Sequence, residues 1–257
     1  MSASVSSPHE NPTVAGTPQD QLILSRMTKA SHILYVEGQN DFNHGQISAR
    51  RGNSDEFWIR GAAMGFDEVT ENSFGLCNMA GEKLSGNVTI PPEWPIHSAV
   101  YSRKTTINAI VHTHAPNALI FGAMRRPLVP ISHDGCVFYG KLGYFDLTTN
   151  TILDLRTANA MVDELGDGKA LLLKNHGLVT AGANIKEATI LALCLEQACA
   201  FQLRAEASGT FSGSDSEDVL AKRDFIFSAV AINTYWSYFE RKLSRVLAGQ
   251  QLPEHRV

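Results

Sequence analysis

The chain has 257 residues, of which 44% are hydrophobic, and its formal net charge is −4. This composition can build the core of one α/β domain. The absence of clustered Lys and Arg argues against nucleic acid or an anionic membrane as a partner. No apolar stretch approaches the roughly 18 residues of a membrane-spanning helix. With nucleic acid and membrane both disfavoured as partners, we expect a small-molecule substrate.

The cysteines and the N-terminal segment indicate the cellular compartment in which we expect the protein. Four cysteines are present: Cys77, Cys136, Cys194 and Cys199. They are sparse and form no Cys-x-x-Cys pair, so we expect reduced thiols. Residues 1–16 are rich in Ser and Pro and have no apolar core of a secretory signal. We therefore expect a soluble, cytoplasmic protein with a flexible tail at 1–16 and a single domain at 17–250.

Hydrophobic periodicity and turn residues predict the elements. Thr17-Pro18 supplies a hydroxyl cap and a first-turn proline for a helix over 18–36. Short apolar segments between Gly, Asn and Asp then predict strands at 46–49, 57–59 and 75–78. The same signals predict helices at 95–103, 115–124, 184–207 and 218–247, and strands at 107–113, 171–173 and 178–180. Helices that flank a set of short strands indicate an α/β fold with three α/β/α layers.

Two histidines end the predicted strand 107–113. His112 and His114 are separated by one residue, and alternate residues of a strand point to the same face. Two imidazoles on one rigid face form half of a transition-metal site. The alternative is one histidine that hydrogen-bonds in the core and one without a role. His176 favours the metal site, because it lies in a turn between two apolar strands, where functional side chains are common.

Glu93 is the fourth candidate. Pro91, Pro92 and Pro95 restrict the backbone around it, which suits an acid or base held in a fixed position. The alternative is a surface glutamate at a helix N-terminus, where the helix dipole favours a negative charge.

These motifs resemble the class II aldolase/adducin family over about residues 20–205. The matching segments are Gly45-Gln46-Ile47-Ser48, Ala62-Ala63-Met64-Gly65, Ile90-Pro91-Pro92-Glu93, His112-Thr113-His114 and Asn175-His176-Gly177. The last two are specific, and the first three depart from the family pattern. The resemblance implies a three-layer α/β/α class II aldolase-like domain with a mixed, largely antiparallel central sheet.

The resemblance also implies a ligand set. His112, His114 and His176 would bind a divalent metal ion (Zn, Mn, Co or Fe), and Glu93 would ligate it at rest and act as acid or base in catalysis. Three imidazoles and a carboxylate suit several of these ions.

A further implication is a homotetramer with active sites between subunits. The aromatic final helix, with Tyr235 and Trp236, would then reach a neighbouring site. Packing within the subunit is the alternative for most of these aromatic side chains.

The departures bear on the substrate. In the family's sugar-phosphate aldolases and epimerases, Asn, Thr and Ser side chains hold the phosphate. Here Pro91 and Pro92 replace paired serines and offer neither hydroxyl nor N–H, Gln46 replaces the Asn, and Ala62-Ala63-Met64 replaces the Thr-rich loop. A phosphate dianion needs several convergent donors, so we expect a substrate without phosphate.

One branch of the family matches better. Asp41-Phe42-Asn43-His44-Gly45 and the Pro-Pro-Glu segment resemble decarboxylases of hydroxylated aromatic or heteroaromatic dicarboxylic acids, such as a dihydroxyphthalate-type substrate. The metal would accept electron density as CO₂ leaves, and Glu93 or His133 would protonate the ring carbon. The alternative for His133 is a surface histidine beside Asp134.

The candidate substrate-binding residues are His44, Gln46, Arg60 and Tyr235. His44 and Arg60 are candidates for a second carboxylate, although Arg60 is equally compatible with an exposed arginine that contacts no substrate.

Two other functions remain open. An aldolase or epimerase on a small carbohydrate-like substrate without phosphate would use the same electron sink. A non-catalytic, adducin-like interaction domain is disfavoured, because all three histidines and Glu93 are present.

Overall fold

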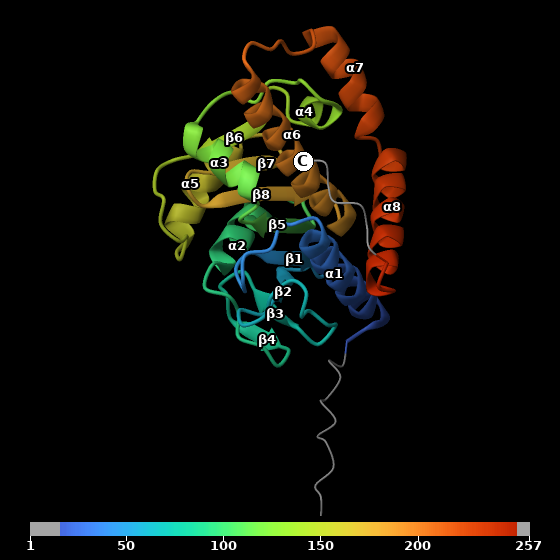
Figure 1. Cartoon of the computed structure of the whole chain (residues 1–257). Coiled ribbons are helices and arrows are strands. Elements are labelled where there is room, and N and C mark those ends of the chain that lie inside the picture. Colours follow the sequence, from blue (N-terminus) through green and yellow to red (C-terminus); the bar gives the residue numbers. More distant parts are fainter. Residues whose placement is uncertain (1–15, 251–257) are drawn as a thin grey trace, which may run out of the picture.

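An eight-stranded mixed sheet runs through the centre of the protein, and helices cover both of its faces (Figure 1). The computed structural model describes residues 16–250, so the tail predicted at 1–16 lies outside the described residues except for Gly16. The strand order is β4-β3-β2-β1-β5-β8-β7-β6. Within the described residues, only β6 and β7 run parallel, and every other neighbouring pair is antiparallel. The predicted mixed, largely antiparallel sheet is therefore confirmed.

The strands place β5 in the middle of the sheet, between β1 and β8. Their bounds are β1 (Gln46–Arg50), β2 (Glu56–Arg60), β3 (Phe74–Asn78), β4 (Lys83–Ser85), β5 (Ala109–Thr113), β6 (Leu142–Phe145), β7 (Ala170–Leu173) and β8 (Gly177–Gly182). Side chains alternate between two cores, since Val111 packs into one and Ile110 into the other. All five residues of β5 are buried, so this strand is held from both sides.

The helices form the outer two layers. One face of the sheet is covered mainly by α1 (Pro18–Val36), α3 (Pro116–Met124), α6 (Ile185–Ser208) and α8 (Ala229–Leu247), and the other by α2 (Trp94–Arg103) and α5 (Leu155–Leu165). The short helix α4 (His133–Val137) and α7 (Ser216–Ile226) lie near the end of α6 in Figure 1. No helix within residues 16–250 is both long and apolar enough to cross a membrane.

The start of α1 shows how local sequence fixes the layers. Thr17 and Asp20 form a capping box, in which each side chain accepts a hydrogen bond from the other residue's backbone N–H. The buried Asp20 carboxylate also accepts hydrogen bonds from Arg51 and from the Trp58 indole. A single acidic residue therefore ties the first helix to β2 and to the loop that precedes it.

The C-terminal helical region differs from the prediction. The expected continuous helix over 218–247 is wrong, because the chain breaks between α7 and α8. Phe227 ends α7, and the Ser228 hydroxyl accepts from the Ala231 N–H to begin α8. Three further elements, β4, β6 and α5, were not predicted, and His133 begins a short helix that Ser132 caps.

Candidate metal centre

Four side chains from three parts of the fold converge at the end of β5. The candidate ligand atoms of Glu93, His112, His114 and His176 all lie within 4.8 Å of one another. The imidazole centroids are 4.9–5.2 Å apart. The Glu93 carboxylate lies 3.5 Å from His112 Nε2 and 3.3 Å from His176 Nε2. The structure thus brings together all four residues that the sequence analysis proposed as ligands, which we call the four-residue cluster.

Hydrogen bonds orient two of the imidazoles. His112 Nδ1 donates to the Leu178 carbonyl at 2.8 Å, and His114 Nδ1 donates to the Asp41 carboxylate at 2.7 Å. These bonds fix the protons on Nδ1 and leave the Nε2 lone pairs free. Both Nε2 atoms are buried and have no hydrogen-bond partner among residues 16–250. Burial, then the nearby His112, lower the pKa of His114 to about 4, so this ring is neutral at pH 7.

Glu93 provides the negative charge of the cluster. It precedes the first turn of α2, with Pro95 just inside the helix, and is 6% exposed. Burial raises the pKa of its carboxyl, but the close approach of the His112 and His176 rings outweighs burial and holds the pKa far below its usual value. Its Oε1 also accepts from the Ile152 N–H at 3.2 Å. Glu93 is therefore an ionised, oriented carboxylate and not a free surface residue.

The turn between β7 and β8 places His176 against β5. Asn175 adopts a positive φ of 55°, which tightens the turn. Gly177 follows, where a Cβ would lie 2.2 Å from the Thr113 carbonyl oxygen and 3.0 Å from the His114 ring. Only glycine allows this approach, so the Asn-His-Gly sequence has a direct geometric basis.

Two of the predicted substrate residues border the cluster. Gln46 is the cross-strand partner of His112, so both side chains point to the α2 side of the sheet. Its Oε1 is buried and has no hydrogen-bond partner in the described part of the chain. His44 is exposed, and its ring lies 5.6 Å from that of His114. Asp41 bridges these two imidazoles, accepting from His44 at 3.1 Å; the sequence analysis placed it in a motif but gave it no role in the site.

Arg60 does not join the cluster. It alternates with Ile59, so its side chain points to the opposite side of the sheet. It is fully buried, and its Nη2 donates to the backbone carbonyls of Asn43, His44 and Gly45. These contacts indicate a role in holding the loop that carries Asp41 and His44.

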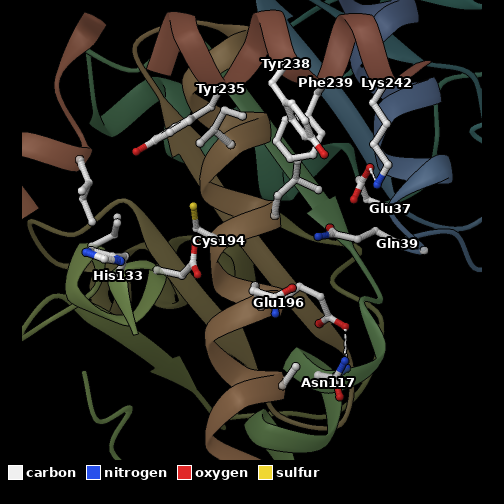
Figure 2. A pocket seen from close by; sticks show the side chains of 18 of the residues that line it. Glu37, Gln39, Asn117, His133, Cys194, Glu196, Tyr235, Tyr238, Phe239 and Lys242 are labelled. Atoms are coloured by element: carbon white, nitrogen blue, oxygen red, sulfur yellow. Dashed lines mark hydrogen bonds and ion pairs between the residues drawn. The ribbon is translucent and has the colours of Figure 1, made fainter. Parts of the chain in front are cut away.

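His133 and Tyr235 also lie away from the cluster. Both line a cavity of about 600 Å³ between α6 and α8. Figure 2 shows Tyr235 projecting from α8, with His133 at one end of the cavity and the Glu37–Lys242 ion pair at the other. The cavity lies on the side of the sheet opposite the four-residue cluster. Within one subunit, neither residue reaches the proposed ligands.

Trp236 belongs to the packing of the subunit itself. It is 2% exposed and lies in the core beneath α8. Trp236 therefore packs within its own subunit and does not extend toward a neighbouring one.

The donor set fits a divalent transition metal. Three imidazoles and one carboxylate are the ligand types that Zn, Mn, Co and Fe accept. The two buried Nε2 lone pairs without partners carry this assignment, because a buried polar atom is normally paired. A bound ion would satisfy both atoms.

Known proteins share this arrangement of elements. Residues 25–203 match the family model described as "Class II Aldolase and Adducin N-terminal domain". An L-fuculose phosphate aldolase from Methanococcus maripaludis is 30% identical over 68% of this chain and 92% of its own length. The decarboxylase NovR from Streptomyces niveus is 28% identical over 61% of this chain and 58% of its own length. A solved L-fuculose 1-phosphate aldolase from Glaciozyma antarctica superposes with a TM-score of 0.81 at 24% identity, covering 93% of this chain and 96% of that chain.

Proposed function

The chain belongs to the class II aldolase and adducin N-terminal domain family, and from this premise we propose that it is a divalent-metal-dependent decarboxylase. The proposed substrate is a hydroxylated aromatic or heteroaromatic dicarboxylic acid of the dihydroxyphthalate type. The observation that carries the proposal is the convergence of Glu93, His112, His114 and His176 at a site where side chains that would hold a phosphate are replaced.

The replaced positions argue against a phosphorylated substrate. Pro91 and Pro92 directly precede Glu93 and offer no hydroxyl or N–H. The backbone N–H of Ala62 already donates to the Thr89 carbonyl at 3.0 Å, and its side chain has no polar atom. A phosphate dianion would therefore find few hydrogen-bond donors on these segments. A carboxylate with a neighbouring hydroxyl needs fewer donors.

The residues of the site have different roles in the proposed reaction. His112, His114 and His176 would hold the ion, which when bound supplies Lewis acidity to offset the negative charge that develops as CO₂ leaves. Glu93 is ionised, so it can accept the proton of the substrate hydroxyl. As the carbon–carbon bond breaks, its electron pair stays on the ring carbon, and Glu93 returns the proton to that carbon. His44 is exposed beside His114, where it can contact a second carboxylate.

A retro-aldol or epimerase reaction on a small carbohydrate-like substrate without phosphate is the second candidate. The 30% identity with an L-fuculose phosphate aldolase favours it. Both reactions leave negative charge on a carbon next to a group bound by the metal, so one cluster serves either.

Product analysis separates the two. Protein loaded with Mn²⁺, Co²⁺ or Zn²⁺ is incubated with ortho-hydroxy aromatic acids, including dihydroxyphthalates, and released CO₂ is measured. We expect CO₂ from at least one acid, loss of that activity in Glu93→Gln, and no loss in the exposed control Glu71→Gln. Aldehyde formation from an unphosphorylated ketose without CO₂ release would establish the second candidate. Absence of both reactions in metal-loaded protein would leave the non-catalytic interaction domain.

We place this activity in a cytoplasmic homotetramer with sites between subunits. His133 and Tyr235 lie far from the cluster of their own subunit, which is compatible with a role in a neighbour's site. Co-expression of His133→Ala and His112→Ala subunits tests this, because mixed oligomers would regain some wild-type sites. No recovery of activity in mixed oligomers would assign His133 to its own subunit.

A further inference from the structure

A buried hydrogen-bond chain leads from α2 and β1 toward the four-residue cluster. His97 Nδ1 lies 2.7 Å from the Ser48 hydroxyl, and that hydroxyl lies 2.7 Å from the Tyr101 hydroxyl. His97 and Tyr101 come from successive turns of α2, and Ser48 comes from β1. Each of the three residues is at most 1% exposed, so bulk solvent does not reach their polar atoms.

Burial fixes the direction of this chain. Ser48 is the only hydrogen-bond partner of the Tyr101 hydroxyl within residues 16–250. If Ser48 donated to Tyr101, the Tyr101 hydrogen would be buried without an acceptor, which is costly. Tyr101 therefore donates to Ser48. The Ser48 hydrogen then needs an acceptor too, and His97 Nδ1 is the remaining partner of this hydroxyl within residues 16–250, so Ser48 donates to His97. A neutral His97 must then carry its proton on Nε2.

The Nε2–H of His97 has no acceptor among the described residues. His97 lies one helical turn after Glu93 on the same side of α2. His97 contacts Ser48, which lies on the same face of β1 as Gln46, the cross-strand partner of His112, so His97 is on the cluster's side of the sheet. Burial lowers its pKa to about 3, so it is neutral at pH 7. The cluster thus borders a fixed, uncharged donor that the proposed ligand set does not use.

We propose that His97 Nε2–H donates a hydrogen bond to an oxygen atom of the substrate held at the four-residue cluster. This inference rests on the proposed function, because it requires a substrate that reaches the cluster. An oxyanion is the acceptor that suits a rigid neutral donor in a buried site, and a carboxylate or ionised hydroxyl provides it. Gln46 adds a second unsatisfied polar atom on this side of the sheet.

Two substitutions separate donation from a structural role. Glutamine places its amide nitrogen near the position of the histidine Nε2, whereas the shorter asparagine reaches only the position of Nδ1. The probes are salicylate, an aromatic hydroxy acid, and acetohydroxamate, a non-aromatic chelator with two oxygens. Titration calorimetry on Zn-loaded protein gives both affinities, and zinc content and thermal unfolding report whether each variant is intact.

We expect His97→Asn to weaken the binding of each probe about tenfold or more. The affinity of His97→Gln for each probe should stay within about threefold of the wild-type affinity. Zinc content should be unchanged in both. Equal loss in the two variants, or wild-type affinity in His97→Asn, would overturn the proposal. The ¹⁵N shifts of labelled wild-type protein provide a test without substitution, since a proton on Nδ1 of His97 would also overturn it.

The two probes distinguish this inference from the proposed function. If acetohydroxamate binds and salicylate does not, the aromatic-acid substrate is rejected, and His97 is judged on acetohydroxamate alone. If neither binds the Zn-loaded wild type, both proposals are rejected.

Discussion

Replacing Asp41 with asparagine should weaken metal binding without removing a proposed ligand. The Asp41 carboxylate accepts from His114 Nδ1 at 2.7 Å and from His44 at 3.1 Å. The hydrogen bond from His114, opposed by burial, lowers the pKa of Asp41, so the residue is ionised at neutral pH. An ionised acceptor makes His114 Nε2 more basic and holds the ring toward the cluster.

The expected size follows from these contacts. Asparagine keeps an acceptor oxygen but loses the charge. A hydrogen bond to a charged group contributes about 1 kcal/mol more than a neutral one, which corresponds to about a fivefold to tenfold loss of affinity. Asp41→Ala removes the acceptor as well. We expect it to approach the roughly 100-fold loss at the upper end for such supporting residues.

Competition with a chromophoric chelator measures the zinc affinity directly. Asp55→Asn is the matched control, because Asp55 is exposed and lies in the loop between β1 and β2. Thermal unfolding of zinc-free protein checks that the variants fold. Zinc affinity of Asp41→Asn within twofold of Asp55→Asn would refute the view that Asp41 supports His114.

Three other predictions concern the fold and the cluster. Burial raises the pKa of Asp20, but its hydrogen bonds, led by that from Arg51, together outweigh burial and lower the pKa to about 2. The stabilisation that Asp20 provides should be full above the ordinary carboxyl pKa of 3.8 and disappear as the pH falls toward 2. Urea unfolding of Asp20→Asn should show a loss of about 2 kcal/mol at pH 7 and a flatter pH dependence below pH 4, and an unchanged pH profile would contradict this. Gly177→Ala should cost about 1–3 kcal/mol and weaken zinc binding, since its Cβ would clash with the Thr113 carbonyl; wild-type stability and affinity would show that the turn adjusts freely. His112→Ala should abolish the fall in melting temperature that a chelator causes in zinc-loaded wild type, and an equal fall in the variant would place the metal elsewhere.

The sequence predicts best where local chemistry and tertiary packing agree. The helix 18–36 begins at Thr17 as expected, because the capping box needs only residues close in sequence. His112 and His114 converge because strand alternation places them on one side before any tertiary contact forms. The separation of β7 from β8 by a single tight turn similarly brings His176 to β5, since β8 pairs with β5 along its length.

The sequence fails where a role depends on a partner distant in the chain. His97 lies four residues after Glu93, and that spacing alone is common on helices. Its role becomes visible only when β1 brings Ser48 to α2. Arg60 was a candidate for a substrate carboxylate, but strand alternation turns it to the opposite side of the sheet, where backbone carbonyls occupy its Nη2. Neither outcome could be read from residue type or local spacing.

The cavity between α6 and α8 and the four-residue cluster lie on opposite sides of the same strand. His112 points to the cluster, and the next residue, Thr113, donates to Gln39 at 2.9 Å. Gln39 lines the cavity and donates to the Ala192 carbonyl of α6. Because these bonds are buried, movement of α6 relative to β5 would have to break them or carry the strand along. The position of His112 therefore depends on packing on both sides of the sheet.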